Sequence, residues 1–194
     1  MHRQRMARRV ASVLAGIALL GGAFAVSTRA DQTDPRLDEL FGQLQVAESA
    51  AEARAIEDEI WAIWHRYDGD ARGVEQWMRL GQLWNGIGDR IQAHRYYTLV
   101  TEAAPDFAEG WNRRATVAYL LGDFAGSLED IDRVLALEPR HFGALSGMGL
   151  VLLQLDRPEE ALDAFERTVE VNPYALGAQQ NIERLRPIVE GEPI

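Results

Sequence analysis

Few side chains in this sequence of 194 residues have the type and spacing that catalysis or metal binding requires. Cysteine and lysine are both absent, which excludes disulfides, thiolate zinc sites, thiol nucleophiles and Schiff-base chemistry. His65, His94 and His141 lack the spacing of metal ligands, so we expect each on the surface or in packing contacts. No Gly-rich phosphate loop and no Gly-x-Ser-x-Gly motif occurs. We therefore expect no catalytic residue, no cofactor and no metal ion, and we predict that the protein is not an enzyme.

The charge of the chain argues against nucleic acid as a partner. The net charge is −10, and it becomes −15 without residues 1–30, which hold five Arg and no acidic residue. An acidic body of this kind repels phosphate backbones and anionic lipid headgroups. Glu129, Asp130 and Asp132 form a local acidic cluster. They lack the loop spacing of a calcium site, so we expect a solvated helix face there.

The first thirty residues have the organisation of an export signal. Residues 1–9 hold four Arg, and residues 10–26 are apolar or small without a charge. Small residues follow, with cleavage expected after Ala25 or Ala30. The apolar run is short for a membrane span, so we expect residues 1–30 to be a signal peptide, with a retained N-terminal anchor as the alternative. Either way, the folded part is expected in the periplasm or outside the cell, with membrane contact only through this segment.

The elements that position the remaining side chains recur with a period of about 34 residues, a length typical of stacked helical units. Pro105, Pro139 and Pro173 are equally spaced and mark this period. Other positions keep the same step. They are Trp77 and Trp111; Gly81, Ala115 and Gly149; Gly88 and Gly122; Ala93, Ser127 and Ala161; and Tyr97, Ile131 and Phe165. Apolar residues recur at steps of three and four within each copy, which predicts helices that share one core.

The first copy reads Trp77-x2-Leu80-Gly81-x2-Trp84, followed by Ala93-x3-Tyr97 and Pro105. Over residues 74–173 this pattern resembles the tetratricopeptide repeat (TPR) family. The resemblance implies an all-α fold, a TPR-type α-solenoid of stacked antiparallel helix pairs. It assigns repeats to residues 74–107, 108–141 and 142–173.

Local signals mark the turns of these pairs. Gly88 and Gly122 lie in the turn between the two helices of a copy, where a positive φ is readily adopted. Asp89 and Asp123 follow them and are expected to cap the second helix. In the third copy Asp156 takes the glycine position. The small residues Gly81, Ala115 and Gly149 are expected to let the paired helices pack closely.

Residues at both ends of the repeats predict further helices. Asp34 and Pro35 open a helix to about Val46, and the Ser49-x-x-Glu52 capping box opens another through about Tyr67. We expect residues 34–73 to form a degenerate TPR-like helix pair that begins the stack. Residues 174–187 are expected to form a capping helix, and residues 188–194 a frayed tail.

Bulky and charged residues within the helices have structural interpretations. All five tryptophans are expected to pack in the core, because they lie at helical core spacing. These are Trp61, Trp64, Trp77, Trp84 and Trp111. Arg114 occupies the position of Leu80 and Met148 in the other copies. We expect its aliphatic part to pack while its guanidinium pairs with a neighbouring acid, with an anchor at the groove edge as the alternative.

The TPR resemblance implies a concave groove lined by the first helix of each pair. The expected groove residues are Met78, Gln82, Asn85, Asn112, Arg113, Thr116, Tyr119, Ser146, Leu150 and Leu153. Asn and Gln can hydrogen-bond a peptide backbone, and Met, Leu and Tyr can hold apolar side chains. Some TPR domains clamp a C-terminal carboxylate with Lys and Asn; here lysine is absent, and Asn112 with Arg113 is the pair left to meet a carboxylate.

We therefore predict a non-catalytic protein–protein interaction module that binds a peptide segment or helix of another envelope protein. Its expected role is that of a periplasmic adaptor or assembly factor. One alternative is a structural TPR protein of the envelope that self-associates as a homo-oligomer. The other is a small-ligand binder or an enzyme.

Overall fold

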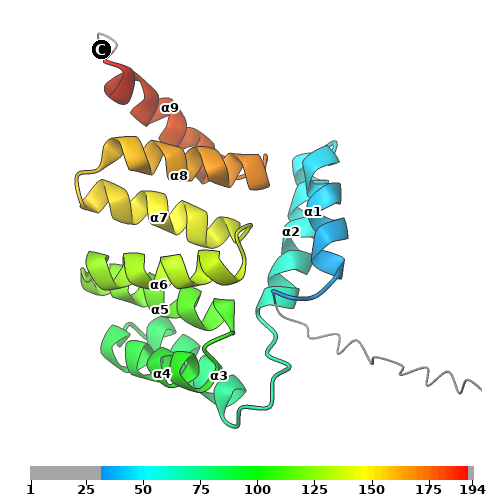
Figure 1. Cartoon of the computed structure of the whole chain (residues 1–194), viewed down its shortest axis with the longest axis vertical. Helices are drawn as coiled ribbons and strands as arrows, with labels where there is room; N and C mark the ends of the chain where they lie inside the picture. The colour runs from blue at the N-terminus through cyan, green and yellow to red at the C-terminus, as the bar shows by residue number, and fades with distance from the viewer. Residues whose placement is uncertain (1–31, 192–194) are drawn as a thin grey trace, which may run out of the picture.

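Residues 32–191 are described by the computed structural model, and all regular structure within this range is helical (Figure 1). The helices are α1 (Arg36–Val46), α2 (Ala50–Trp64), α3 (Val74–Gly86), α4 (Arg90–Ala103), α5 (Ala108–Leu121), α6 (Phe124–Leu137), α7 (Phe142–Gln154), α8 (Pro158–Val171) and α9 (Leu176–Glu190). Within this range no helix is both long and apolar enough to cross a membrane. The export signal expected in residues 1–30 lies outside the described residues.

Helices α3 to α9 form successive antiparallel layers, which confirms the all-α solenoid (Figure 1). Each of the ranges 74–107, 108–141 and 142–173 contains one helix pair, and α9 packs on α8. Small residues on the first helices allow close approach. A Cβ at Gly81 would lie 2.6 Å from the ring of Tyr97, and a Cβ at Gly149 would lie 2.6 Å from the ring of Phe165. Both rings are buried, so they form the core of their pairs.

The turns within the pairs have the expected backbone. Gly122 has a φ of 82°, and Asp156 adopts the same left-handed region with a φ of 56°. The side chain of Asp123 accepts a hydrogen bond from the Gly126 N–H at 3.0 Å, and Asp89 caps α4 in the same way. These turns reverse the chain within a few residues and keep the paired helices antiparallel.

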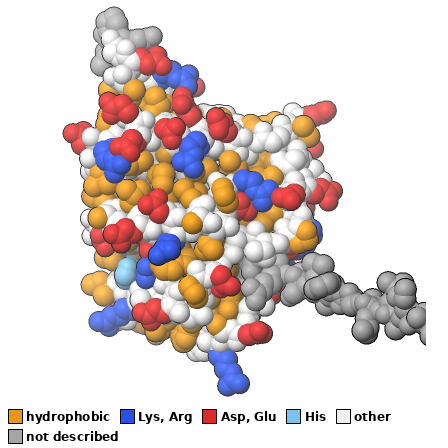
Figure 2. All heavy atoms as spheres, in the orientation of Figure 1, with side chains coloured by type: hydrophobic (Ala, Val, Ile, Leu, Met, Phe, Trp, Pro, Cys, Tyr) orange, Lys and Arg blue, Asp and Glu red, His pale blue; other side chains and the backbone are white. Residues whose placement is uncertain are grey.

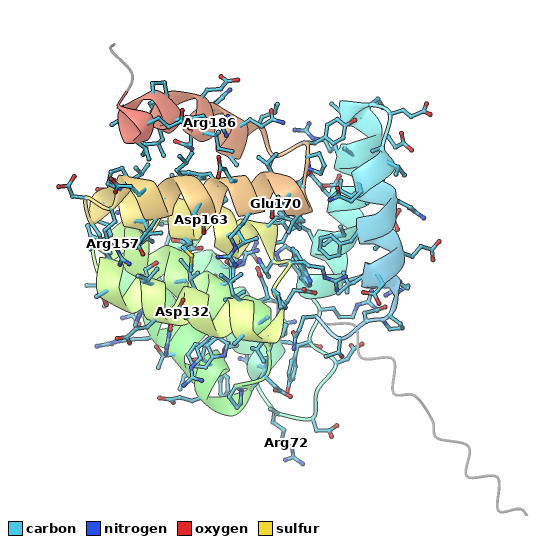
Figure 3. All side chains as sticks on the ribbon, turned by 45° about the horizontal axis from the view of Figure 1, so that its top comes forward. Arg72, Asp132, Arg157, Asp163, Glu170 and Arg186 are labelled. Carbon is cyan, nitrogen blue, oxygen red and sulfur yellow. The ribbon has the colours of Figure 1, made fainter. Side chains whose placement is uncertain are left out.

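The first helix pair does not begin the stack, so its expected position is wrong. Helices α1 and α2 lie across the ends of the layers, beside the turns that connect successive pairs (Figure 1). Their shared apolar face encloses Phe142, and Val171 and Tyr174 pack against it. Figure 3 shows Glu170 at the end of α8 that faces this pair, where the Gln45 amide donates to its carbonyl oxygen at 2.8 Å. The linker between α2 and α3 is also longer than the turn between α4 and α5.

Two helix ends differ from the expected ones. α2 ends at Trp64 and not at Tyr67, which belongs to the linker. There the Tyr67 hydroxyl accepts a hydrogen bond from the Ala71 N–H at 3.2 Å, and its ring packs on Phe107. α9 does not fray at residue 188 but continues to Glu190 with Pro187 inside it. Val189 packs against the core of α7 and α8, and the exposed Arg186 guanidinium lies 2.6 Å from the Glu166 carboxylate of α8.

The tryptophans pack as expected, but only one of them is fully buried. Trp64 is 1% exposed, whereas the others are half-buried against clusters of buried residues. Arg114 forms the expected ion pair, with two hydrogen bonds of 2.8 and 2.7 Å to Asp130 and one of 3.0 Å to Thr101. Asp130 is therefore buried inside the stack, and its expected place on a solvated acidic face is wrong.

This ion pair gives the first prediction. Replacing Arg114 with Met, the residue of the third copy, leaves the buried Asp130 carboxylate without its partner. We expect a loss of about 3 kcal/mol in the free energy of unfolding. Replacing Asp130 with Leu in the same chain should recover most of this loss, because an apolar pair needs no compensating charge. Urea unfolding followed by circular dichroism measures both variants. Equal losses in the two variants would mean that the unpaired carboxylate is not the cause.

Candidate functional site

A buried carboxylate lies at the start of α5, beside the expected groove. The Glu109 side chain has no exposed surface. Its Oε1 accepts a hydrogen bond from Arg113 Nε at 2.6 Å, and its Oε2 accepts one from Asn112 Nδ2 at 2.8 Å. All three residues belong to α5, and the spacing of three and four residues places them on one helix face.

Two histidines from other elements complete the surroundings of this carboxylate. His65 follows α2, and its Nε2 lies 3.0 Å from Glu109 Oε1. His141 precedes α7, and its Nε2 lies 3.3 Å from Glu109 Oε2. The Nδ1 of His141 accepts the Ala144 N–H at 3.1 Å, so the ring proton stands on Nε2 and points to the carboxylate. Arg113 Nη2 also contacts His65 Nε2.

Tryptophans of α2 cover this cluster. The Trp64 ring stacks on His141 with centroids 4.1 Å apart and an interplanar angle of 10°. The Trp61 ring stacks on His65 at 5.3 Å. The indoles therefore cover His141 and one face of His65, and they attach α2 to the second and third repeats. We call Glu109, Asn112, Arg113, His65 and His141 the Glu109 cluster.

The Glu109 cluster is electrostatically consistent with an ionised carboxylate. Burial acts to raise the pKa of Glu109, but the hydrogen bonds from His141 and His65 and the charge of Arg113 outweigh it. The pKa of Glu109 is consequently held far below its usual range. The described residues contain no group of His, Asp or Glu that could hold a metal ion. The cluster is thus suited to fastening α2 to the repeats.

Sequence reasoning misses this convergence. Both His65 and His141 do pack against other residues, but the sequence places them in separate helix pairs, and it does not single out Glu109. One feature of the repeat period could have indicated a buried polar contact at His141. His141 stands one full period after Phe107, which is buried, so a polar ring occupies a core position and needs a partner there.

The expected groove residues are divided among three clefts. A cleft of about 360 Å³ between the α2–α3 linker and α3 includes Met78, Gln82 and Arg113. A groove of about 210 Å³ between α5 and α7 includes five of the expected residues. These five are Asn112, Thr116, Tyr119, Ser146 and Leu150. A third cleft of about 520 Å³, beside Trp61 and His65, includes Asn112, Arg113 and Thr116. Asn85 and Leu153 line none of these three clefts, and Leu153 instead packs with the core of α7, α8 and α9.

Asn112 and Arg113 already bind a carboxylate of the protein itself. We expected this pair to meet the carboxylate of a ligand, but both side chains donate to Glu109. The physical reason is that a buried carboxylate needs donors close at hand, and the next turn of α5 supplies them. The pair therefore holds the Glu109 cluster together and does not stand free in the groove.

The groove between α5 and α7, which we call the α5–α7 groove, is lined by small and apolar residues. Gly143, Ala144 and Gly147 contribute small surfaces, while Tyr119 and Leu150 contribute larger apolar ones. Leu150 is 39% exposed. Surfaces of this kind can hold an apolar side chain, and Ser146 adds a polar group at the same place.

At its α2 end the α5–α7 groove meets the third cleft, because Asn112, Thr116 and Gly143 line both. Gly143 opens α7 next to Trp61, and a Cβ at Gly143 would lie 2.6 Å from Trp61 Cη2. The indole therefore fits only because residue 143 has no side chain. From there the groove runs along α5 and α7, with Tyr119 and Leu150 among its lining residues.

The Glu109 cluster gives the second prediction. Glu109→Gln keeps the size of the side chain but leaves Arg113 without its buried counter-charge. We expect a loss of about 3–5 kcal/mol and release of α1 and α2 from the repeats. Glu75→Gln is the matched control, because Glu75 occupies the same position one repeat earlier and is exposed. Hydrogen exchange of α1 and α2, together with urea unfolding, measures the effect. Wild-type protection of α2 in Glu109→Gln would show that the carboxylate does not fasten it.

The lowered pKa of Glu109 gives the third prediction. A depressed pKa in the folded state stabilises the protein above the usual pKa of 4.5, and this contribution is lost as the pH falls below that value. The wild type should therefore lose stability below about pH 4.5 more steeply than Glu109→Gln. Thermal unfolding between neutral and acidic pH measures the difference, and parallel curves for the two proteins would contradict it.

Comparisons with known proteins agree with the repeat architecture. The family model described as tetratricopeptide repeat matches residues 121–175. A TPR repeat-containing protein of Rhizobium etli is 33% identical over 156 residues, which cover 80% of this chain and 76% of that protein. The anaphase-promoting complex subunit 7 of Dictyostelium discoideum is 36% identical over 76 residues, which cover 39% of this chain but only 13% of that protein.

Solved structures show the same fold. The first TPR of Spaghetti (RPAP3) bound to the HSP90 peptide SRMEEVD superposes with a TM-score of 0.60 at 23% identity. It covers 62% of this chain and 96% of that one. The crystal structure of MamA gives a TM-score of 0.59 at 20% identity, covering 81% of this chain and 84% of that one. Together with the match to the Rhizobium protein, these findings show that the chain belongs to the tetratricopeptide repeat family.

Proposed function

We propose that this protein is a non-catalytic binding module that holds a segment of another protein in the α5–α7 groove. The observation that carries the proposal is the groove itself. Gly147 leaves room between two helices, and Tyr119 and Leu150 offer apolar contacts beside it. A peptide can place an apolar side chain in such a space while its backbone bonds to polar groups at the edge.

Solved structures with this fold support a peptide as the ligand class. One similar structure contains an HSP90 peptide, and another is a complex of the TPR2B domain of yeast Sti1 with pHsp70. At identities of 23% and 19%, these structures support the same fold but do not identify the ligand of this chain. The residues of this groove determine which segment it binds. Because no charged residue lines the groove, it favours an apolar segment over an acidic one.

The place of action is the second part of the proposal. We propose an adaptor or assembly factor in the periplasm, with another envelope protein as its partner. The order of basic, apolar and small residues in residues 1–30 supports export, and the lack of cysteine suits an oxidising compartment. Fractionation of the native host followed by N-terminal sequencing tests this part. An intact N-terminus in the cytosolic fraction would contradict it.

The fourth prediction tests the groove. A Cβ at Gly147 would meet only Ile131 Cδ1, at 3.8 Å, so Gly147→Met is accommodated and its side chain occupies the groove. Replacing a helical glycine also favours the helix by up to about 1 kcal/mol, so the melting temperature should not fall. We expect at least about tenfold weaker partner binding, which corresponds to about 1.4 kcal/mol.

Gly177→Met is the matched control, because nothing lies within 4 Å of a Cβ at this position of α9. Crosslinked pull-downs from the native envelope fraction compare the wild type with both variants, and the affinity for the identified partner segment is then measured. A partner lost with Gly147→Met and kept with Gly177→Met is the expected result. Equal capture by both variants would place the binding site elsewhere. Substitutions of Asn112 or Arg113 are unsuitable here, because they also disrupt the Glu109 cluster.

A further inference from the structure

The α3 end of the stack is not covered by another repeat. A comparison of equivalent positions in the three repeats shows this. Leu83 of α3 is 58% exposed, whereas Val117 and Val151, which hold the same position in the next two repeats, are each 1% exposed. The two valines are covered because the preceding repeat packs on them. No repeat precedes α3 in the described part of the stack, since α1 and α2 lie against the turns of the later repeats.

This face is not shaped to receive another repeat in register. Gly110 of α5 faces the preceding repeat, and a Cβ there would lie 2.6 Å from Val100 Cγ1. Its counterpart in the next repeat, Ala144, is also small and buried. The corresponding residue of α3 is Gln76, whose long side chain prevents the same close approach. The α3 face therefore lacks the small residue that lets α5 and α7 pack closely on the repeats before them.

The uncovered surface is apolar around the turn between α3 and α4. Ile87 is 64% exposed and Ile91 is 61% exposed, so three large apolar residues stand in water at this end. We call Leu83, Ile87 and Ile91 the open-end patch. Figure 2 shows exposed hydrophobic side chains over α3 and α4 in the lower part of the view. A cluster of this kind at the end of a solenoid marks an interaction surface.

The charge of this end selects the partner. Residues 74–103 contain three acidic residues and three Arg, so they are neutral in a chain whose net charge is −10. Two copies of the chain repel each other over most of their surfaces, but not at this end. The opposite end of the stack does not match the patch, because Gln180, Glu183 and Arg184 stand exposed between the apolar residues at the two ends of α9.

We propose that the open-end patch is a homodimer interface, in which two copies join through α3 and α4 about a twofold axis. A twofold contact pairs the same patch on both copies. It also closes the assembly at two chains. The proposal does not rest on the function assigned to the α5–α7 groove, because that groove is formed by other helices.

Leu83→Glu tests the interface. Leu83 is exposed in the single chain, so the variant should keep its helicity and melting temperature. Placing a carboxylate in an apolar interface should weaken dimerisation at least about tenfold. The control is Leu176→Glu on α9, which changes an equally exposed leucine at the other end. Sedimentation of the purified protein over a range of concentrations should show a change from one chain to two for the wild type and for Leu176→Glu. Leu83→Glu should remain a single chain throughout.

Cysteine crosslinking provides a second measurement, since the natural chain has no cysteine. Ile87→Cys should form a covalent dimer on mild oxidation, and Leu176→Cys should not. A wild type that stays a single chain at every concentration would overturn the proposal, as would undiminished association of Leu83→Glu. Growth beyond two chains would also overturn it, because it would indicate head-to-tail contacts in place of a twofold one.

Discussion

A carboxylate without access to water must be surrounded by hydrogen-bond donors, and the position of Glu109 decides where the first helix pair of this protein lies. Its donors come from α5 itself, from the end of α2 and from the residue before α7. Removing α2 would leave His141 and Glu109 exposed to water and would separate His65 from its partner. The cluster therefore fixes the docking of α2, and the stacking of Trp64 on His141 shields the Glu109 carboxylate from water.

Two surfaces of the molecule follow from this docking. Because α2 lies at the ends of α5 and α7, Trp61 covers Gly143 and borders the cleft into which the α5–α7 groove continues. Because the same pair is absent from the start of the stack, Leu83 and its neighbours remain in water. The docking of this helix pair thus determines both which residues border the groove at its α2 end and which end of the solenoid is free to bind.

The repeats could be predicted from sequence because their signals are local and recur. Gly122, Asp123 and Gly149 each act within one helix pair, and the regular period repeats each kind of signal along the chain. The Glu109 cluster could not be predicted in this way, because His65 and Glu109 are distant in the sequence and neither belongs to the repeating pattern. The long linker before α3 is a readable sign that the first pair leaves the stack. The burial of Asp130 could not be predicted from the repeat pattern either, because its partner Arg114 replaces an apolar residue of the other copies.

The charged residues beside α2 do not extend into the proposed groove. Arg113 lines both of the clefts beside α2, and Arg66 and Arg79 line one of them, but the charge of Arg113 is balanced by Glu109 at 2.6 Å. An acidic ligand that bound there would have to compete with this buried ion pair. Recognition in the α5–α7 groove consequently depends on shape and apolar contact, through the space above Gly147 and the surfaces of Tyr119 and Leu150. A partner segment that presents an apolar side chain matches this surface, whereas one that relies on carboxylates would meet no positive charge among its lining residues.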